Sequence, residues 1–172
     1  MLSLNTIEKK DLKELLNQSW MTHDAMWFKS CVEKLGIERA NELNLSAVRS
    51  AARIEAIRLK KILGIGKMRK FEDLKSFLES AINLTMPDFM KFEFSFPDVN
   101  SFQYRWKDEE CFAYRGVGRL GVAQSYECGV IPRIIAWLEA LKVSYSLEGP
   151  TEGCMMQRTG SCRGVFRFEF PE

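Results

Sequence analysis

The sequence predicts an α+β fold, in which a helical N-terminal half packs on a mostly antiparallel sheet formed by the C-terminal half. Two observations lead to this prediction. Before about Met86 the apolar residues recur at helical spacing, whereas after it they mostly alternate with polar residues, as strands with one buried face do. One helix, predicted over residues 131–142, interrupts the strands and is expected to lie on one face of the sheet. Residues 1–86 and 87–172 are expected to form one compact unit.

The N-terminal half is predicted to be a series of amphipathic helices. A first helix spans about residues 7–16, and a second is expected to begin at Thr22 or Asp24, because both residue types are good N-caps. Gly36 is a natural C-terminal stop for this second helix.

Two further helices follow Gly36 in the prediction. Residues 37–43 form a short helix or a continuation, and apolar residues at helical spacing then run from Leu45 to the break at Gly64. The last helix of this half covers 71–82, and Pro87 marks its end.

The C-terminal half begins with a predicted hairpin. Phenylalanines alternate with polar residues over 92–96, aromatic residues alternate over 102–106, and the residues between them favour a turn. Further strands are expected over 111–117, 143–147 and 154–157.

The last predicted strand ends in three alternating phenylalanines. Cys162 is an even number of residues from Phe166, Phe168 and Phe170, so its thiol is expected on the same inward face of this strand. Cys162 is therefore predicted to be a core or pocket residue.

The helix over 131–142 has a proline at its start, where a missing N–H costs little. Its apolar stripe consists of Ile134, Ile135, Leu138 and Leu141. Cys128 sits just before this helix, and Arg133 lies in its first turn. A helix N-terminus and a nearby cation both favour a thiolate, so Cys128 is a candidate nucleophile or ligand. The alternative is a small buried residue that leads into the helix.

Composition narrows the class of protein. The chain has 172 residues, 46% of them hydrophobic, and a formal net charge of +2. No apolar run is long enough to cross a bilayer, so a reduced cytosolic protein with free thiols is expected. A basic cluster is interpreted as a solvated helix face, and no nucleic-acid partner is expected. The cluster consists of Arg58, Lys60, Lys61, Lys67, Arg69 and Lys70.

Four of the five cysteines lie in the C-terminal half, without the paired Cys-x-x-Cys spacing of zinc ribbons or fingers. A metal site assembled from distant segments remains open, with Zn or Fe as the metal and Cys128, Cys154 and Cys162 as ligands. The single histidine, His23, excludes a histidine-rich catalytic metal site. It is a candidate fourth ligand or general base, and otherwise a residue near a helix start.

Several short motifs carry a resemblance to a known family. The segments 23–28 (HDAMWF), 36–40 (GIERA) and 54–64 (IEAIRLKKILG) resemble a family of small prokaryotic cytosolic proteins. That family is similar to the L-2-amino-thiazoline-4-carboxylic acid hydrolase-like group. The chain departs from the family pattern at Ala25, where glycine is expected, and in its tail, where phenylalanine replaces tryptophan. The resemblance implies a constellation formed by Asp24, Trp27, Cys128 and Cys162.

Two functions remain open from the sequence. The first is a non-catalytic sensor or binding module for a small molecule, with cysteines that hold a metal or simply pack. The second is a hydrolase-like enzyme for a small polar, amino-acid-like substrate, using a cysteine nucleophile or a cysteine-bound metal. In the enzyme, Cys128 attacks the substrate as a nucleophile or ligates the metal. His23 and Asp24 act as general acid or base, or orient the reacting groups. The expected ligand-binding residues are Trp27, Tyr126, Arg133 and Cys162. A homodimer through the helical half is a further possibility.

Overall fold

The computed structural model describes residues 6–107, 110–149 and 151–170. The helical elements are α1 (Lys9–Leu35), α2 (Ile37–Ile62), α3 (Phe71–Thr85), η1 (Asp88–Met90), α4 (Phe112–Arg119), η2 (Ala123–Ser125), α5 (Val130–Leu141) and α6 (Met155–Thr159). The strands are β1 (Phe92–Ser95), β2 (Ser101–Trp106), β3 (Ser144–Glu148) and β4 (Cys162–Glu169). The fold is α+β, as the sequence predicts.

The four strands form one antiparallel sheet in the order β1-β2-β4-β3. In the central pair, Trp106 lies opposite Cys162, Tyr104 opposite Gly164 and Phe102 opposite Phe166. All of these residues point to the same face, because side chains on a strand alternate between its two faces. The prediction that Cys162 shares the inward face with Phe166 and Phe168 is confirmed, since all three are buried. Phe170, the third phenylalanine of that prediction, follows the end of β4 and is partly buried.

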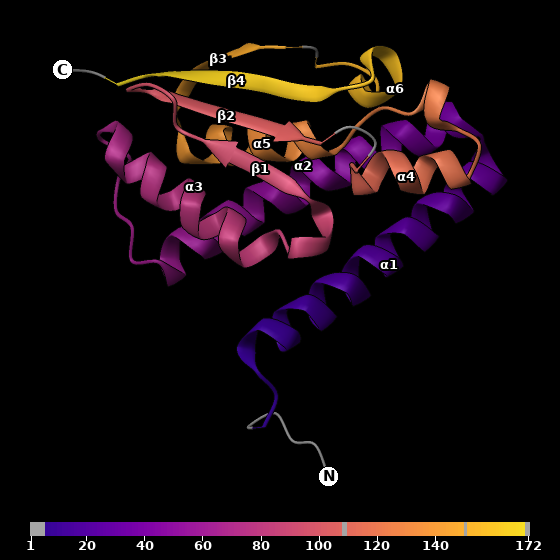
Figure 1. Ribbon diagram of the computed structural model, residues 1–172, viewed down its shortest axis with the longest axis horizontal. Helices are drawn as coiled ribbons and strands as arrows, with labels where there is room; N and C mark the ends of the chain where they lie inside the picture. Colours follow the sequence, from indigo (N-terminus) through magenta and orange to yellow (C-terminus); the bar gives the residue numbers. More distant parts are fainter. Residues whose placement is uncertain (1–5, 108–109, 150, 171–172) are drawn as a thin grey trace.

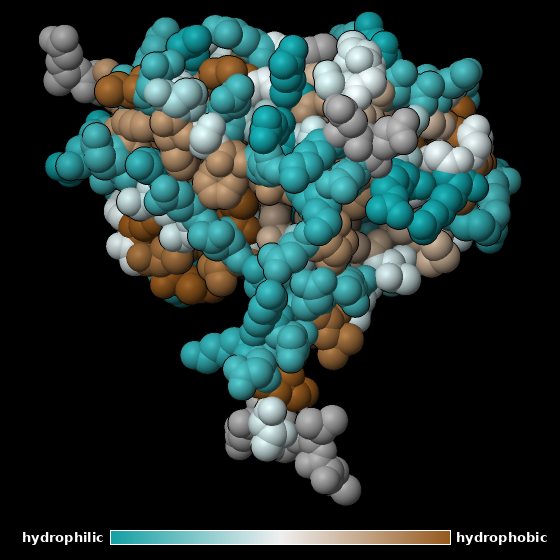
Figure 2. Space-filling view, in the orientation of Figure 1, coloured by the Kyte–Doolittle hydropathy of each residue, from teal (hydrophilic) through white to brown (hydrophobic). Residues whose placement is uncertain are grey.

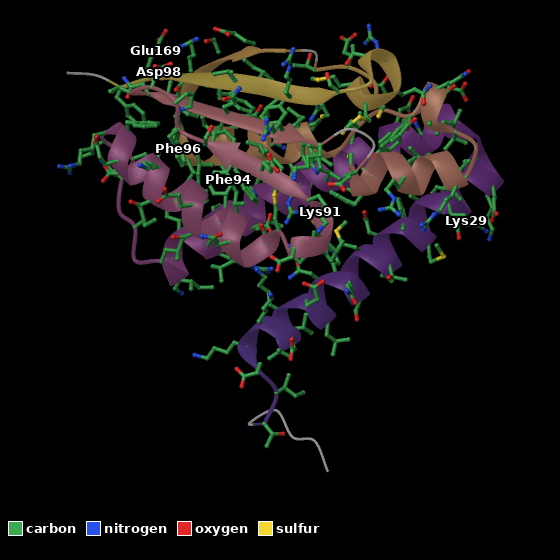
Figure 3. The ribbon with its side chains drawn as sticks, viewed as in Figure 1. Lys29, Lys91, Phe94, Phe96, Asp98 and Glu169 are labelled. Atoms are coloured by element: carbon green, nitrogen blue, oxygen red, sulfur yellow. The ribbon has the colours of Figure 1, made fainter. Side chains whose placement is uncertain are left out.

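Helices α3 and α5 pack against this buried face of the sheet (Figure 1). The rings of Phe71 in α3 and Phe168 in β4 lie 6.1 Å apart, and those of Phe77 in α3 and Trp137 in α5 meet edge to face at 6.2 Å. Phe94 on β1 and Phe96 just after it extend the aromatic packing to Phe102 (Figure 3). The core is therefore a helix layer on one sheet face, rich in aromatic side chains.

Helix α2 lies alongside α5 and also contacts α1, whose first turns extend away from the body (Figure 1). The face of α1 that is turned toward the viewer is mostly hydrophilic (Figure 2). The predicted boundary at residue 86 falls between α3 and β1. Helix α2, before this boundary, contacts α5, which follows it. The expectation that both parts form one compact unit stays a prediction.

The structure corrects four local predictions. Residues 9–35 form one helix, so Thr22 and Asp24 lie within it and cap nothing, because no glycine or proline interrupts this stretch. Residues 37–62 likewise form one helix.

The other two corrections concern predicted strands that are helices. Residues 111–117 contribute to α4, in which Ala113 and Val117 lie four residues apart and pack toward the core. Residues 154–157 begin the short helix α6, which ends at Gly160 in the left-handed conformation, φ 72°. Both segments are too short for apolar periodicity to separate a strand from a helix.

Candidate functional site

Four of the five cysteines line one small pocket at the end of the sheet, between α4, α5 and α6. Cys111 directly precedes α4, Cys128 lies two residues before α5, Cys154 directly precedes α6, and Cys162 begins β4. Sulfur atoms gather in this region of Figure 3. The other lining residues are Ala113, Tyr114, Tyr126, Ile131, Pro132, Thr151, Gly153, Met155 and Met156. Four separate chain segments therefore bring their thiols to one place.

The pocket has a volume of about 20 Å³. That is room for about one water molecule, whereas pockets for organic ligands usually measure at least roughly 300 Å³. A second hollow of about 470 Å³ lies on the open outer surface of the sheet. It is lined by Gln103, Glu148, Gly149, Met155, Thr159, Ser161, Arg163, Gly164 and Val165. The cysteine pocket is thus the size of an inorganic group, and the outer hollow is the size of a small molecule.

Backbone N–H groups in the first turn of a helix favour the charged form of two of the thiols. Those of Tyr114 and Ala113 in α4 act to lower the pKa of Cys111, and those of Val130 and Ile131 in α5 act to lower the pKa of Cys128. The free N–H groups at a helix start carry partial positive charge, so they stabilise an anion there. The pocket thus offers fixed donors to negatively charged sulfur.

Removal from water favours the neutral form of these thiols. Burial raises the pKa of the Cys128 thiol to about 12, more than the N–H groups of Val130 and Ile131 lower it. Burial also raises the pKa values of Cys111 and Cys162. The thiolate expected at Cys128 from the helix N-terminus is therefore not the state of the empty pocket, because desolvation of the charge outweighs the helix.

Helix α2 fixes the loop that carries Cys128. The buried amide of Asn41 donates to the carbonyl of Ser125 at 2.7 Å and accepts the N–H of Glu127 at 3.1 Å. The backbone of Gly129 passes so close to α2 that an added Cβ would lie 3.2 Å from the side chain of Val48. The position of Cys128 is therefore set by direct contacts with α2.

The loop before Cys154 is held to the same segment. Gly153, with φ 69°, donates its N–H to the Glu127 carboxylate at 2.6 Å. Beyond α6, the N–H of Arg163 contacts the Met155 sulfur at 3.3 Å. Glu127 and Met155 thus connect the segments that carry Cys128, Cys154 and Cys162.

Tyr104 has a buried hydroxyl without a partner. Its side chain is fully buried, and its Oη is the buried side-chain polar atom that lacks a hydrogen bond in the described part of the chain. Burial raises the pKa of Tyr104, and the thiols of Cys162 and Cys128 act in the same direction, so the hydroxyl lies near both. An unpaired buried hydroxyl is costly, and such a group in a native fold calls for an explanation.

Tyr126, a predicted ligand-binding residue, lines the pocket and is buried. Its hydroxyl accepts the N–H of Gly129 at 3.5 Å, and its ring meets Phe28 of α1 edge to face at 5.6 Å. Burial and the thiols of Cys128, Cys111 and Cys154 raise the pKa of Tyr126. Tyr126 thus links α1 to the cysteine pocket.

Of the predicted site residues on α1, His23, Asp24 and Trp27 do not line the pocket. His23 is exposed, and Trp27 keeps 42% of its surface exposed. Burial raises the pKa of Asp24, while the positive charge of Arg133 and then His23 oppose that rise. Asp24 is therefore electrostatically linked to Arg133 of α5, away from the cysteine pocket.

Arg133, an expected ligand-binding residue, is already paired within the chain. Its guanidinium binds both carboxylate oxygens of Glu55, at 2.9 and 2.5 Å, and lies over the Trp20 ring at 4.9 Å. The Nε1–H of Trp137 donates to the same carboxylate at 2.8 Å. Glu55 thus takes the place that a ligand carboxylate would need.

The pocket thiols do not form a ready-made site for a single ion. No group of three or more His, Cys, Asp or Glu side chains among residues 6–107, 110–149 and 151–170 is arranged to hold one metal ion. The pocket cysteines are all free thiols. A metal that binds here must therefore draw the sulfurs together or be larger than one ion.

Residues 4–104 match a family of unknown function, DUF6125. This chain belongs to the DUF6125 family. The match covers α1, α2, α3, β1 and most of β2, and ends before Cys111, so the four pocket cysteines all lie beyond the DUF6125 span. No curated protein and no solved structure matches the chain.

Sequence reasoning left Cys111 out of the predicted ligands and did not single out Tyr104. Cys111 was assigned to a strand, and its place before α4 became visible only with the helix. Tyr104 belongs to the alternating aromatic residues of β2, which is typical of core packing. Its one signal is Gly164 on the facing strand, since a glycine inside a strand often marks close approach by another group.

Proposed function

We propose that this protein is a non-catalytic metal-binding module, in which Cys111, Cys128, Cys154 and Cys162 ligate a thiophilic transition metal. The observation that carries the proposal is the convergence of four thiols from four chain segments on one pocket of about 20 Å³. Thiolates are the usual ligands of zinc and of iron–sulfur centres. A reducing cytosol, in which thiols stay reduced, is the compartment that fits these free cysteines.

The electrostatics of the pocket support this role. The neutral thiols of Cys111 and Cys128 gain little from the N–H groups at the starts of α4 and α5, whereas metal-bound thiolates at the same positions gain much more. A metal supplies the positive charge that allows the thiols to ionise away from water, which reverses the effect of burial on their pKa values. The surrounding donors then hold the residual negative charge of the bound group.

The experiment compares metal content in matched variants. Purified natural protein is expected to hold about one metal centre per chain by elemental analysis, and Cys128→Ser or Cys162→Ser is expected to lose most of it. Cys31→Ser is the control, because Cys31 lies on α1 and does not line the pocket. Equal metal content in all four proteins, or none in the natural protein, would overturn the proposal.

The second candidate is the hydrolase-like activity suggested by the resemblance to the L-2-amino-thiazoline-4-carboxylic acid hydrolase-like group. The proximity of Tyr126 and Cys162 to Cys128 favours it, since a nucleophile needs neighbouring polar groups. The raised pKa of Cys128 weighs against it, because an activated cysteine has a lowered pKa. A single thiol that reacts far faster than the rest in metal-free protein would favour the hydrolase, and uniformly slow pocket thiols would favour the metal module.

A further inference from the structure

The hollow on the outer surface of the sheet has no role in the metal-binding function proposed above. We propose that this outer hollow is a separate binding site, which holds a small organic carboxylate on the guanidinium of Arg163. Among the described residues, the linings of the outer hollow and of the cysteine pocket share only Met155. Three observations carry the inference: the size of the hollow, an arginine without an ionic partner, and a second arginine opposite the first.

The size of the outer hollow suits a small molecule. It lies on the sheet face opposite α3 and α5 (Figure 1), and its volume is about 470 Å³. Pockets for organic ligands usually measure roughly 300–1,000 Å³. The apolar side chains of Met155 and Val165 belong to the lining, so the apolar part of a ligand can leave water against them.

Arg163 brings an uncompensated positive charge to the outer hollow. It is exposed on the outer face of β4, which also carries Arg167. Arg167 donates to the Glu148 carboxylate at 2.6 Å. On the adjacent strand β2, Arg105 donates to the Glu93 carboxylate, also at 2.6 Å. Within the described part of the chain, the Arg163 guanidinium has neither an ion pair nor a hydrogen bond.

The register of the sheet places Arg105 directly opposite Arg163. Side chains at such facing positions have Cβ atoms about 5 Å apart, and like charges there destabilise the strand pair. Glu93 compensates Arg105, but this carboxylate also contacts Lys107 at 3.4 Å, so it is shared between two cations. A bound anion would therefore supply the negative charge that Arg163 lacks.

The other polar groups of the outer hollow favour a carboxylate with a single negative charge. A planar guanidinium binds a carboxylate through two parallel N–H donors. The Gln103 amide and the Ser161 hydroxyl also line the hollow, have no side-chain hydrogen bond in the described structure, and can donate to the same oxygens. Glu148 belongs to the lining as well, and its negative charge disfavours a dianion.

The test is a titration of the intact protein with sodium benzoate, followed by the amide NMR signals. The signals of Ser161, Gly164 and Val165 should shift until they saturate. Arg163→Gln should weaken the binding by about tenfold or more, because hydrogen bonds between charged groups contribute at least that factor. Arg105→Gln is the matched control. It removes the same charge from the facing position, outside the lining, and should weaken binding by less than about threefold, because exposed charges are screened.

Several results would overturn the proposal. Shifts that do not saturate would show that no site exists, and equal weakening by the two substitutions would show only attraction to a basic surface. Benzamide has the same ring without the charge and should bind at least about tenfold more weakly. Equal binding of benzamide or of inorganic phosphate would contradict the carboxylate. None of these results depends on the metal content, so this site and the metal-binding function are tested separately.

Discussion

Tyr104 and Gly164 face one another across β2 and β4, and their contact decides what the hydroxyl can reach. The tyrosine ring lies over the position that a side chain on Gly164 would occupy. This pairing places a polar atom in the core beside two thiols, at a cost in hydrogen bonding. At the scale of single residues, the core beside the pocket therefore contains one hydroxyl without a hydrogen-bond partner in the described part of the chain.

The cost can be measured in the metal-free protein. Tyr104→Phe should stabilise the metal-free chain by about 1 kcal/mol, because a buried unpaired hydroxyl costs roughly 1–3 kcal/mol. Urea denaturation of the variant and of the natural protein measures the two free energies of unfolding. A variant that is less stable than the natural protein in the metal-free form would show that the hydroxyl is already satisfied.

Gly164 gives a steric prediction. Gly164→Ala should lower the free energy of unfolding by about 1–3 kcal/mol, because the new methyl group would overlap the Tyr104 ring. Gly116→Ala is the matched control, since Gly116 lies in α4, and a Cβ there meets nothing within 4 Å. That control should be neutral or stabilising, as alanine favours a helix. Equal effects of the two changes, measured by thermal denaturation, would contradict the close contact.

The sequence was sufficient for residues on one strand, because side chains an even number of positions apart point to the same face. Alternation alone placed Cys162 on the buried face with Phe166 and Phe168. It could not show that the Arg133 guanidinium is paired with the Glu55 carboxylate, because these two residues lie far apart in the chain. Nor could it show that four cysteines meet, since their proximity depends on strand order and loop paths.

At the scale of elements, α2 is the helix that positions the site. It holds the Cys128 loop through Asn41, and it fixes α5 through the Glu55–Arg133 pair. Two ion pairs join α2 to α5, one shielded and one exposed. The side chains of Arg133 and Glu55 are 13% and 23% exposed, whereas those of Arg53 and Glu139 are 50% and 45% exposed.

This difference predicts unequal effects of two similar substitutions. Glu55→Ala should cost about 2–4 kcal/mol, because it leaves a shielded guanidinium and the Trp137 N–H without their acceptor. Glu139→Ala should cost less than about 1 kcal/mol, as is typical of exposed pairs. Chemical denaturation of the two variants provides the comparison. If Glu139→Ala lowered the free energy of unfolding more than Glu55→Ala, the Arg53–Glu139 pair would be the more important of the two.

The long helices and the hairpin could be predicted from periodicity, because they are long or strictly alternating. The predicted helix over 131–142 corresponds to α5, and the predicted helix over 71–82 corresponds to α3. The short segments 111–117 and 154–157 were assigned to strands and are helices. These two errors matter most for the site, because both segments carry a pocket cysteine at a helix start.

At the scale of the whole molecule, the sheet and its helix layer form the body, and α1 extends from it (Figure 1). None of the helices in the described part of the chain has both the length and the apolar character that a bilayer span needs. On α1, Leu15 and Leu16 keep 55% and 60% of their surface exposed. The homodimer expected from the sequence stays a prediction, and sedimentation of the intact chain would test it.

The pocket joins segments from most of the C-terminal part, so its contents should affect the stability of the whole fold. Removal of the metal by a chelator is expected to lower the thermal midpoint by several degrees, because binding to the folded state alone stabilises it. The Cys128→Ser variant should show a lower midpoint that no longer responds to the chelator. A midpoint of the natural protein that is unaffected by the chelator would argue against a structural metal.

The most direct measurement of the central claim is the alkylation rate of each cysteine, followed by mass spectrometry before and after metal removal. The proposed metal centre predicts that Cys111, Cys128, Cys154 and Cys162 are protected together and become faster together when the metal is removed. Cys31 serves as the internal reference, and its rate should stay the same. If the four pocket cysteines react at the same rates in both conditions, they do not ligate a metal, and the proposed function is wrong.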